Sequence, residues 1–123
     1  MALILVIEDH PINLKLMVNL LESEGHQVEQ AENAEMALCM LSHHLPHLIL
    51  MDIALPGIDG LALTRKLKGN PQTCRIPIIA LTAYAMNGDQ QKALEAGCNG
   101  YITKPIETRK LPQQVADFLK MQF

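Results

Sequence analysis

The sequence has no tryptophan, only two tyrosines and two phenylalanines, and a net charge of −3. A nucleic-acid-binding surface needs excess positive charge and aromatic rings on which bases stack, so direct binding of nucleic acid is not expected. Long apolar runs are also missing. No run approaches the roughly 20 residues that cross a bilayer, and no charged start leads into a cleavable apolar stretch. We therefore expect a cytoplasmic protein without membrane association.

Cysteine is scarce as well, with three residues at wide spacing and no CxxC motif. An odd number of separated cysteines is typical of reduced thiols, not of a disulfide framework. The chain does have enough apolar residues, 49% of 123, to build a compact core. Because this length leaves little room for a second core, we predict a single domain over residues 1–123.

Three short apolar runs predict strands that are buried on both faces: Leu3–Ile7, Leu48–Met51 and Ile76–Leu81. Two weaker segments, Gln27–Ala31 and Asn99–Thr103, are expected to form the edge strands of the same sheet. The segments between and after them have helical apolar spacing, and three of them end at a glycine: Gly25, Gly69 and Gly97. This alternation predicts an α/β fold of the flavodoxin-like (βα)5 type, with a doubly wound five-stranded parallel sheet in the order 2-1-3-4-5.

Polar residues stand at the carboxyl ends of four of these strands. Glu8 and Asp9 follow the first strand, Asp52 the third, Thr82 the fourth and Lys104 the fifth. Ligands of such sheets bind beyond these ends, at the switch point between strands 1 and 3, so we expect the five side chains to meet. Taken singly, each has an ordinary interpretation as a helix cap, a turn residue or a solvated charge. Their joint placement favours a functional site.

Three carboxylates in one pocket repel one another unless a cation neutralises them, and oxygen ligands favour Mg²⁺, with Mn²⁺ as the alternative. A carboxylate can attack phosphorus to form an acyl phosphate, and a metal can bridge that nucleophile and the phosphoryl oxygens. Lys104 and Thr82 would supply a positive charge and a hydroxyl donor for the other oxygens. The residues therefore indicate metal-assisted phosphoryl transfer to one of the three carboxylates.

Four segments carry a resemblance to a known family: Ile7–Asn13, Leu50–Gly60, Ala80–Ala83 and Tyr101–Pro105. They resemble the receiver domain of two-component response regulators, and the resemblance covers essentially the whole chain. It implies that Asp52 is the phosphoacceptor. It also implies that Asp9, Asp52 and the backbone carbonyl of Ala54 ligate Mg²⁺, and that Glu8 acts largely through water.

The same resemblance implies a switch. Thr82 and Lys104 look like the pair that senses the phosphoryl group, Tyr101 looks like the aromatic residue that swings inward, and the Lys104–Pro105 bond is expected to be cis. The face formed by the fourth helix, fifth strand and fifth helix would then change shape and be recognised by a downstream protein.

The resemblance also implies the partners. The phosphoryl donor is expected to be a histidine kinase or a histidine phosphotransfer protein, and the chain itself a monomer or weak dimer. It would be a signalling protein and not an enzyme with external substrates, catalysing only its own phosphorylation and dephosphorylation.

The narrower similarity is to stand-alone cell-division regulators of the DivK type or to receivers of hybrid histidine kinases. The chain starts just before the first strand and ends with the last helix, which favours a stand-alone regulator. A flavodoxin-like cofactor binder is disfavoured because Glu8 and Asp9 would repel a flavin phosphate. An Asp-nucleophile phosphatase is disfavoured because Ala54 stands where a second acid would protonate the leaving group.

Overall fold

The architecture is a parallel sheet with helices on both faces. The computed structural model describes residues 2–53, 60–82 and 89–121. The described residues form the strands β1 (Leu3–Ile7), β2 (Gln27–Ala31), β3 (Leu48–Asp52), β4 (Ile78–Thr82) and β5 (Gly100–Thr103). The helices are α1 (Pro11–Ser23), α2 (Ala34–Leu41), α3 (Gly60–Lys68), α4 (Asp89–Ala96) and α5 (Leu111–Lys120). All strand pairs are parallel, in the order β2-β1-β3-β4-β5, so the predicted (βα)5 fold is confirmed.

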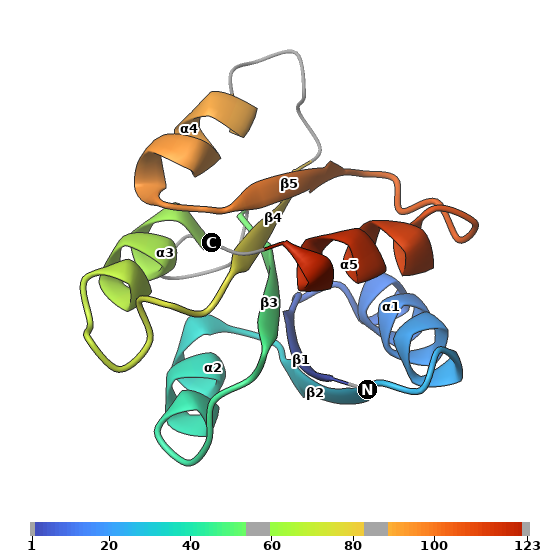
Figure 1. Ribbon diagram of the computed structural model, residues 1–123, viewed down its shortest axis with the longest axis horizontal. Helices are drawn as coiled ribbons and strands as arrows, with labels where there is room; N and C mark the ends of the chain where they lie inside the picture. Colours follow the sequence, from blue (N-terminus) through green and yellow to red (C-terminus); the bar gives the residue numbers. More distant parts are fainter. Residues whose placement is uncertain (1, 54–59, 83–88, 122–123) are drawn as a thin grey trace.

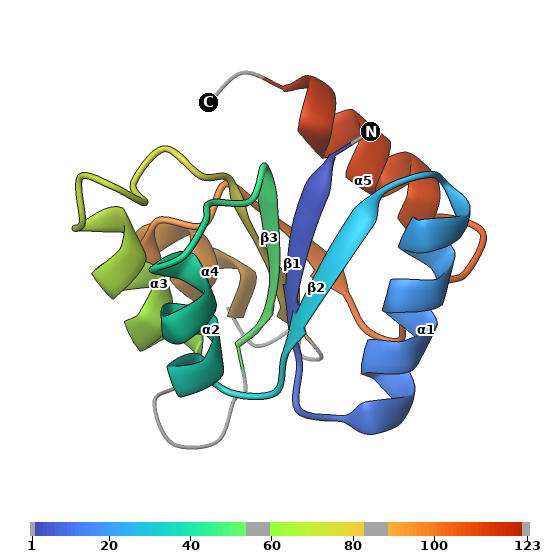
Figure 2. The same ribbon diagram turned by 90° about the horizontal axis from the view of Figure 1, so that it is seen from below.

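The sheet divides the apolar core into two halves. Helices α1 and α5 cover one face, and α2, α3 and α4 cover the other (Figure 1). Alternate strand residues point to opposite faces, so Val6 and Leu50 pack under α1 and α5, whereas Ile7 and Met51 pack under α2 and α3. Since both faces are covered, the central strands are continuously apolar, and β2 forms one edge of the sheet (Figure 2).

The fourth strand starts two residues later than its apolar run predicts, at Ile78 instead of Ile76. Pro77 has no N–H to donate to the ladder. The N–H of Ile76 donates to the carbonyl of Thr73, so this residue closes a turn before the strand. At its other end β4 includes Thr82, which therefore lies in the last position of the strand and not beyond it.

Two smaller predictions are confirmed. The cysteines are free thiols, with Cys39 exposed, Cys74 partly buried and Cys98 buried. The Lys104–Pro105 peptide bond is cis. In the ranges that the structure describes, no helix has the length and apolar character needed to cross a membrane.

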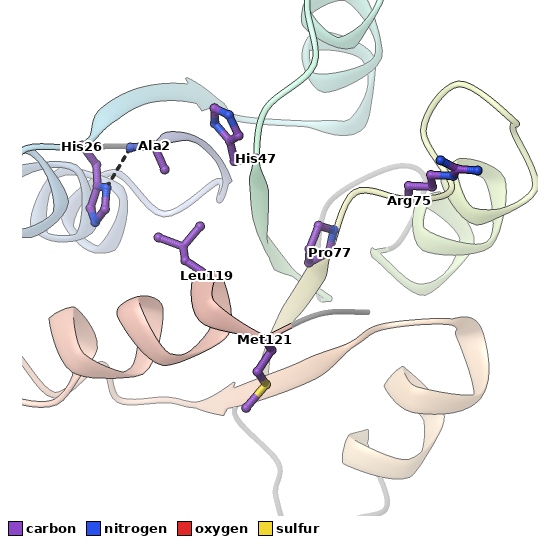
Figure 3. A pocket seen from close by; sticks show the side chains of 7 residues that line it. All are labelled: Ala2, His26, His47, Arg75, Pro77, Leu119 and Met121. Atoms are coloured by element: carbon purple, nitrogen blue, oxygen red, sulfur yellow. Dashed lines mark hydrogen bonds between the residues drawn. The ribbon is translucent and has the colours of Figure 1, made fainter.

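A cavity of about 490 Å³ opens at the amino-terminal edge of the sheet, opposite to the strand ends that carry the polar side chains (Figure 3). Ala2, His26, His47 and Pro77 line it, and each stands just before a strand. The Nδ1 atom of His26 accepts a hydrogen bond from the N–H of Ala2 at 3.3 Å. Nδ1 can accept this bond only when it is unprotonated, so the contact favours the neutral ring with its proton on Nε2.

Mild acid is expected to destabilise the fold through His26. Burial lowers the pKa of this imidazole below its usual value of 6.5, so the unfolded chain binds more protons than the folded one near this pH. The free energy of unfolding should therefore decrease as the pH falls through about 6.5, and should decrease less in His26→Gln. Urea unfolding of both proteins at pH 8 and pH 5 measures the difference. An identical pH dependence in the two proteins would contradict the assignment.

Candidate functional site

The carboxyl edge of the sheet brings three carboxylates together. Glu8 and Asp9 follow β1, and Asp52 ends the neighbouring strand β3. One oxygen of each carboxylate lies within 4.8 Å of the others; Glu8 and Asp52 are buried, and Asp9 is exposed. Among the described residues, this is the one group of three or more acidic, histidine or cysteine side chains that is close enough to hold a metal ion.

Local strand geometry explains why Glu8 turns inward. Its N–H donates to the carbonyl of Ala31 at 3.0 Å, which extends the β1–β2 ladder one residue past the strand. Side chains alternate along an extended chain, so Glu8 lies on the same face as Ile4 and Val6, the face covered by α1 and α5. A carboxylate is therefore fully buried at the end of an apolar strand.

Lys104 bridges two of the carboxylates. Its ammonium group donates to Oε1 of Glu8 at 3.1 Å and to Oδ2 of Asp52 at 3.0 Å. Its backbone N–H donates to the carbonyl of Thr82 at 2.7 Å, which continues the β4–β5 ladder by one bond. The strand pairing thus directs the lysine side chain from the far edge of the sheet back to the carboxylates.

Among the described residues of the site, carboxyl groups outnumber ammonium groups. Burial raises the pKa of Glu8 to about 7, and the neighbouring Asp52 carboxyl adds to this rise through a hydrogen bond and charge repulsion. Burial works to lower the pKa of Lys104, but hydrogen bonds and attraction from Asp52 and Glu8 raise it overall. In the part of the chain that the structure describes, one ammonium group therefore faces three carboxyl groups, and a bound cation would relieve the repulsion that remains.

The donor set suits a hard divalent cation. All three side chains offer carboxylate oxygens, which Mg²⁺ and Mn²⁺ prefer, and no thiolate or imidazole of a described residue belongs to the cluster. The exposed Asp9 leaves one side of the cluster open to solvent, where water or the oxygens of another molecule can complete the coordination. The residues present therefore fit such an ion.

The other predicted site residues are distributed as follows. Thr82 is fully buried at the carboxyl end of β4, the strand next to β3, so it lies at the same edge of the sheet as Asp52. Tyr101 lies in β5 opposite Ala80 and is 37% exposed. Ala54, predicted to contribute its backbone carbonyl, lies outside the described residues.

Sequence reasoning missed the contribution of Gly60 to this site. A Cβ atom at Gly60 would lie 2.4 Å from Cα of Ile53 and 2.6 Å from the carbonyl oxygen of Asp52. The N–H of Gly60 also donates to the carbonyl of Ile53 at 3.1 Å. The first residue of α3 therefore packs directly on the backbone that carries Asp52. The sequence does contain a signal for this contact. Gly60 stands at the start of a helix, where a residue with a capping side chain is more common.

Fold and site together define a class of protein: a doubly wound parallel sheet with a lysine-bridged cluster of carboxylates at the switch point between β1 and β3. The chain belongs to the response regulator receiver domain family, which matches residues 4–116. It is thus a receiver domain of two-component signalling, and the family resemblance carried by the sequence motifs is confirmed.

The similar proteins include a response regulator and the receiver domains of two histidine kinases. The chain is 38% identical over 116 residues to the polar-differentiation response regulator DivK of Brucella anthropi, covering 94% of each chain. The receiver domain of a signal transduction histidine kinase from Syntrophus aciditrophicus has a TM-score of 0.88 at 37% identity, covering 97% of this chain and 90% of that one. A sensor histidine kinase receiver from Pseudomonas aeruginosa has a TM-score of 0.89 at 33% identity, covering 98% of each chain, and that structure has a magnesium ion coordinated in its active-site cleft.

Proposed function

We propose that residues 1–123 form one receiver domain that acts as a phosphorylation-controlled switch, with Asp52 as the phosphoacceptor. The observation that carries this proposal is the setting of the Asp52 carboxylate. It is only 5% exposed, it receives a hydrogen bond from Lys104 at 3.0 Å, and it lies in a cluster with two further carboxylates. The match of the receiver family over residues 4–116 supports both the single domain and the role of Asp52.

The proposed metal is Mg²⁺, with Mn²⁺ as a substitute. Asp9, Asp52 and the backbone carbonyl of Ala54 would hold it, with Glu8 acting through water. The magnesium ion in the Pseudomonas aeruginosa receiver supports this choice. When bound, the ion would neutralise the carboxylates and draw phosphoryl oxygens towards the nucleophile.

The proposed reaction is a transfer between two proteins. The donor is a histidine kinase or a histidine phosphotransfer protein that carries a phosphorylated imidazole. An oxygen of Asp52 forms a bond to phosphorus while the bond from phosphorus to the imidazole nitrogen breaks. The electron pair of that bond stays on the imidazole nitrogen, and the proton already on the other ring nitrogen makes the departing imidazole neutral. Lys104 is already within hydrogen-bonding distance of Asp52, so its ammonium group can meet the charge on a phosphoryl oxygen.

The output is proposed to be a change in the face formed by α4, β5 and α5. The phosphoryl group adds nearly two negative charges and three acceptor oxygens, which Thr82 and Lys104 would satisfy. Tyr101, half-exposed on β5, would turn inward as Thr82 moves. A downstream protein would bind the altered face, with no direct contact to nucleic acid, and the chain would act as a cytoplasmic monomer or weak dimer. The same chemistry would serve a receiver of a hybrid kinase, a role supported by the two kinase receivers of similar structure.

Labelling by acetyl phosphate tests this function. Radioactive phosphoryl incorporation is expected to approach one per chain with Mg²⁺ and to vanish with EDTA. Asp9→Asn should weaken Mg²⁺ binding by more than about tenfold. The loss of a residue that only orients a metal ligand already lowers metal affinity by about 10- to 100-fold, and Asp9 is proposed to be a ligand itself. The matched control is Glu24→Gln, an exposed carboxylate that precedes β2 at the opposite edge of the sheet. A wild-type protein that takes up no label would overturn the proposal.

A further inference from the structure

Strand β5, which delivers Lys104 to the site, has little of its own to fix its register. It is four residues long, lies at the edge of the sheet, and buries only the side chain of Ile102. It also begins with Gly100, which has no side chain of its own and is packed by the ring of Phe118 from α5, since an added Cβ would lie 2.6 Å from Cε1 of Phe118. A slip by one residue would turn every side chain of the strand to the opposite face. The position of Lys104 therefore depends on contacts outside the strand.

Asn99 supplies such contacts at the start of the strand. Its N–H donates to the carbonyl of Ile78 at 2.7 Å, and its side-chain oxygen Oδ1 accepts from the N–H of Ile78 at 2.9 Å. The side chain thus takes a place in the β4–β5 ladder, just before the pair formed by Ile79 and Gly100. The same Oδ1 atom accepts from Nζ of Lys68 at 2.8 Å, so both of its lone pairs are used.

Lys68, the last residue of α3, holds this asparagine in place. Its ammonium group also donates to the carbonyls of Ile76 at 2.8 Å and Cys74 at 3.2 Å, so all three of its hydrogen atoms have acceptors. Its stem packs against Gly97, where an added Cβ would lie 2.9 Å from Cγ of Lys68. Lys68 therefore joins the end of α3, the segment before β4 and the turn between α4 and β5.

We propose that Lys68 and Asn99 are positioning residues that set the register of β5 on β4 and, through it, the reach of Lys104 to Asp52 and Glu8. Hydrogen bonds hold both ends of the β4–β5 ladder. The N–H of Asn99 donates to the carbonyl of Ile78 at the start, and the N–H of Lys104 donates to the carbonyl of Thr82 at the end. Only four strand residues separate Asn99 from Lys104, so a shift in the pairing at Asn99 also displaces Lys104. The effect of Lys68 and Asn99 on the register does not depend on the proposed function. The effect of that register on phosphoryl binding by Lys104 does rest on the proposed function.

Amide hydrogen exchange in the metal-free protein tests the register. Lys68→Met keeps the apolar stem and removes the three donors, and it should speed exchange at Ile102 and Lys104 by about tenfold or more. Exchange in the central strands, for example at Val6 and Leu50, should rise much less. Lys68→Arg should restore most of the protection, since a guanidinium group also donates several hydrogen bonds. Equal acceleration throughout the sheet would show a merely structural role and overturn the proposal.

Matched variants sharpen this result. Asn99→Ala removes both accepted hydrogen bonds and should behave like Lys68→Met, whereas Asn99→Asp keeps the acceptor oxygen and should resemble the wild type. Lys66→Met is the control, because Lys66 is an exposed lysine in the same last turn of α3. Faster exchange in β5 of Lys66→Met, to the same extent as in Lys68→Met, would contradict a specific role for Lys68.

Binding of beryllofluoride, a phosphoryl mimic, tests the consequence for the site. With Mg²⁺ present, Lys68→Met should weaken beryllofluoride binding by about tenfold while Mg²⁺ affinity stays unchanged, because the carboxylates are untouched. The double variant Lys68→Met with Lys104→Met should bind no more weakly than Lys104→Met alone. Wild-type affinity in Lys68→Met would overturn the inference. A wild-type protein that binds no beryllofluoride would instead contradict the proposed function, and hydrogen exchange would still decide the register.

Discussion

Asp52→Asn is expected to reduce labelling by acetyl phosphate to background, a loss of more than about a thousandfold. An amide has no carboxylate oxygen to form an acyl phosphate, although it matches the shape of the acid. Phosphoryl incorporation with Mg²⁺, measured over a time course, gives the result directly.

The same variant should remain folded, which separates loss of chemistry from loss of structure. Removing one of three clustered carboxylates relieves repulsion, and the pKa of Glu8 should fall part of the way towards its usual value because Asp52 contributes to raising it. The melting temperature should therefore not decrease. Asp117→Asn, a change on the outer surface of α5, serves as the control and should label normally. Stoichiometric labelling of Asp52→Asn would contradict the assignment of the phosphoacceptor.

The order of the strands could be predicted because each strand in the middle of the sheet is buried on both faces. Leu3–Ile7 and Leu48–Met51 are continuously apolar for this reason, and the helices that cover them leave their own periodicity in the chain. The convergence of Glu8, Asp52 and Lys104 followed from topology, since the carboxyl ends of parallel strands share one edge. The positions of these three residues at one edge of the sheet could thus be inferred without any knowledge of side-chain contacts.

Contacts between distant segments could not be predicted in the same way. Lys68 and Asn99 are 31 residues apart, and their hydrogen bond depends on how α3 packs beside the turn before β5. The hydrophobic periodicity of the sequence does not indicate such a contact. A lysine at the end of a helix is common in any case, because its positive charge interacts favourably with the helix dipole. The late start of β4 has a similar origin, because Ile76 is apolar enough for a strand but its backbone is held by the turn and by Lys68.

Gly60→Ala is expected to have the second large effect, this time on the scaffold of the site. The new Cβ would lie 2.4 Å and 2.6 Å from two backbone atoms, Cα of Ile53 and the carbonyl oxygen of Asp52, and backbone cannot rotate away as a side chain can. Overpacking of this kind costs about 1–3 kcal/mol, and contacts this short place it at the upper end. If the free energy of unfolding falls by about 3 kcal/mol, the melting temperature should fall by roughly 10 °C.

Gly69→Ala is the matched control at the other end of α3. Its added Cβ would meet only the carbonyl oxygens of Arg65 at 3.3 Å and Lys66 at 3.8 Å, so a small shift suffices. Loss of backbone freedom in the unfolded chain should then leave its stability near that of the wild type or slightly above. At 10 °C, where both variants are folded, Gly60→Ala should also bind Mg²⁺ more weakly and label more slowly, because the displaced backbone carries Asp52. Normal labelling of a destabilised Gly60→Ala would mean that Gly60 supports only the start of α3, and that the position of Asp52 is held by β3 and its neighbours alone.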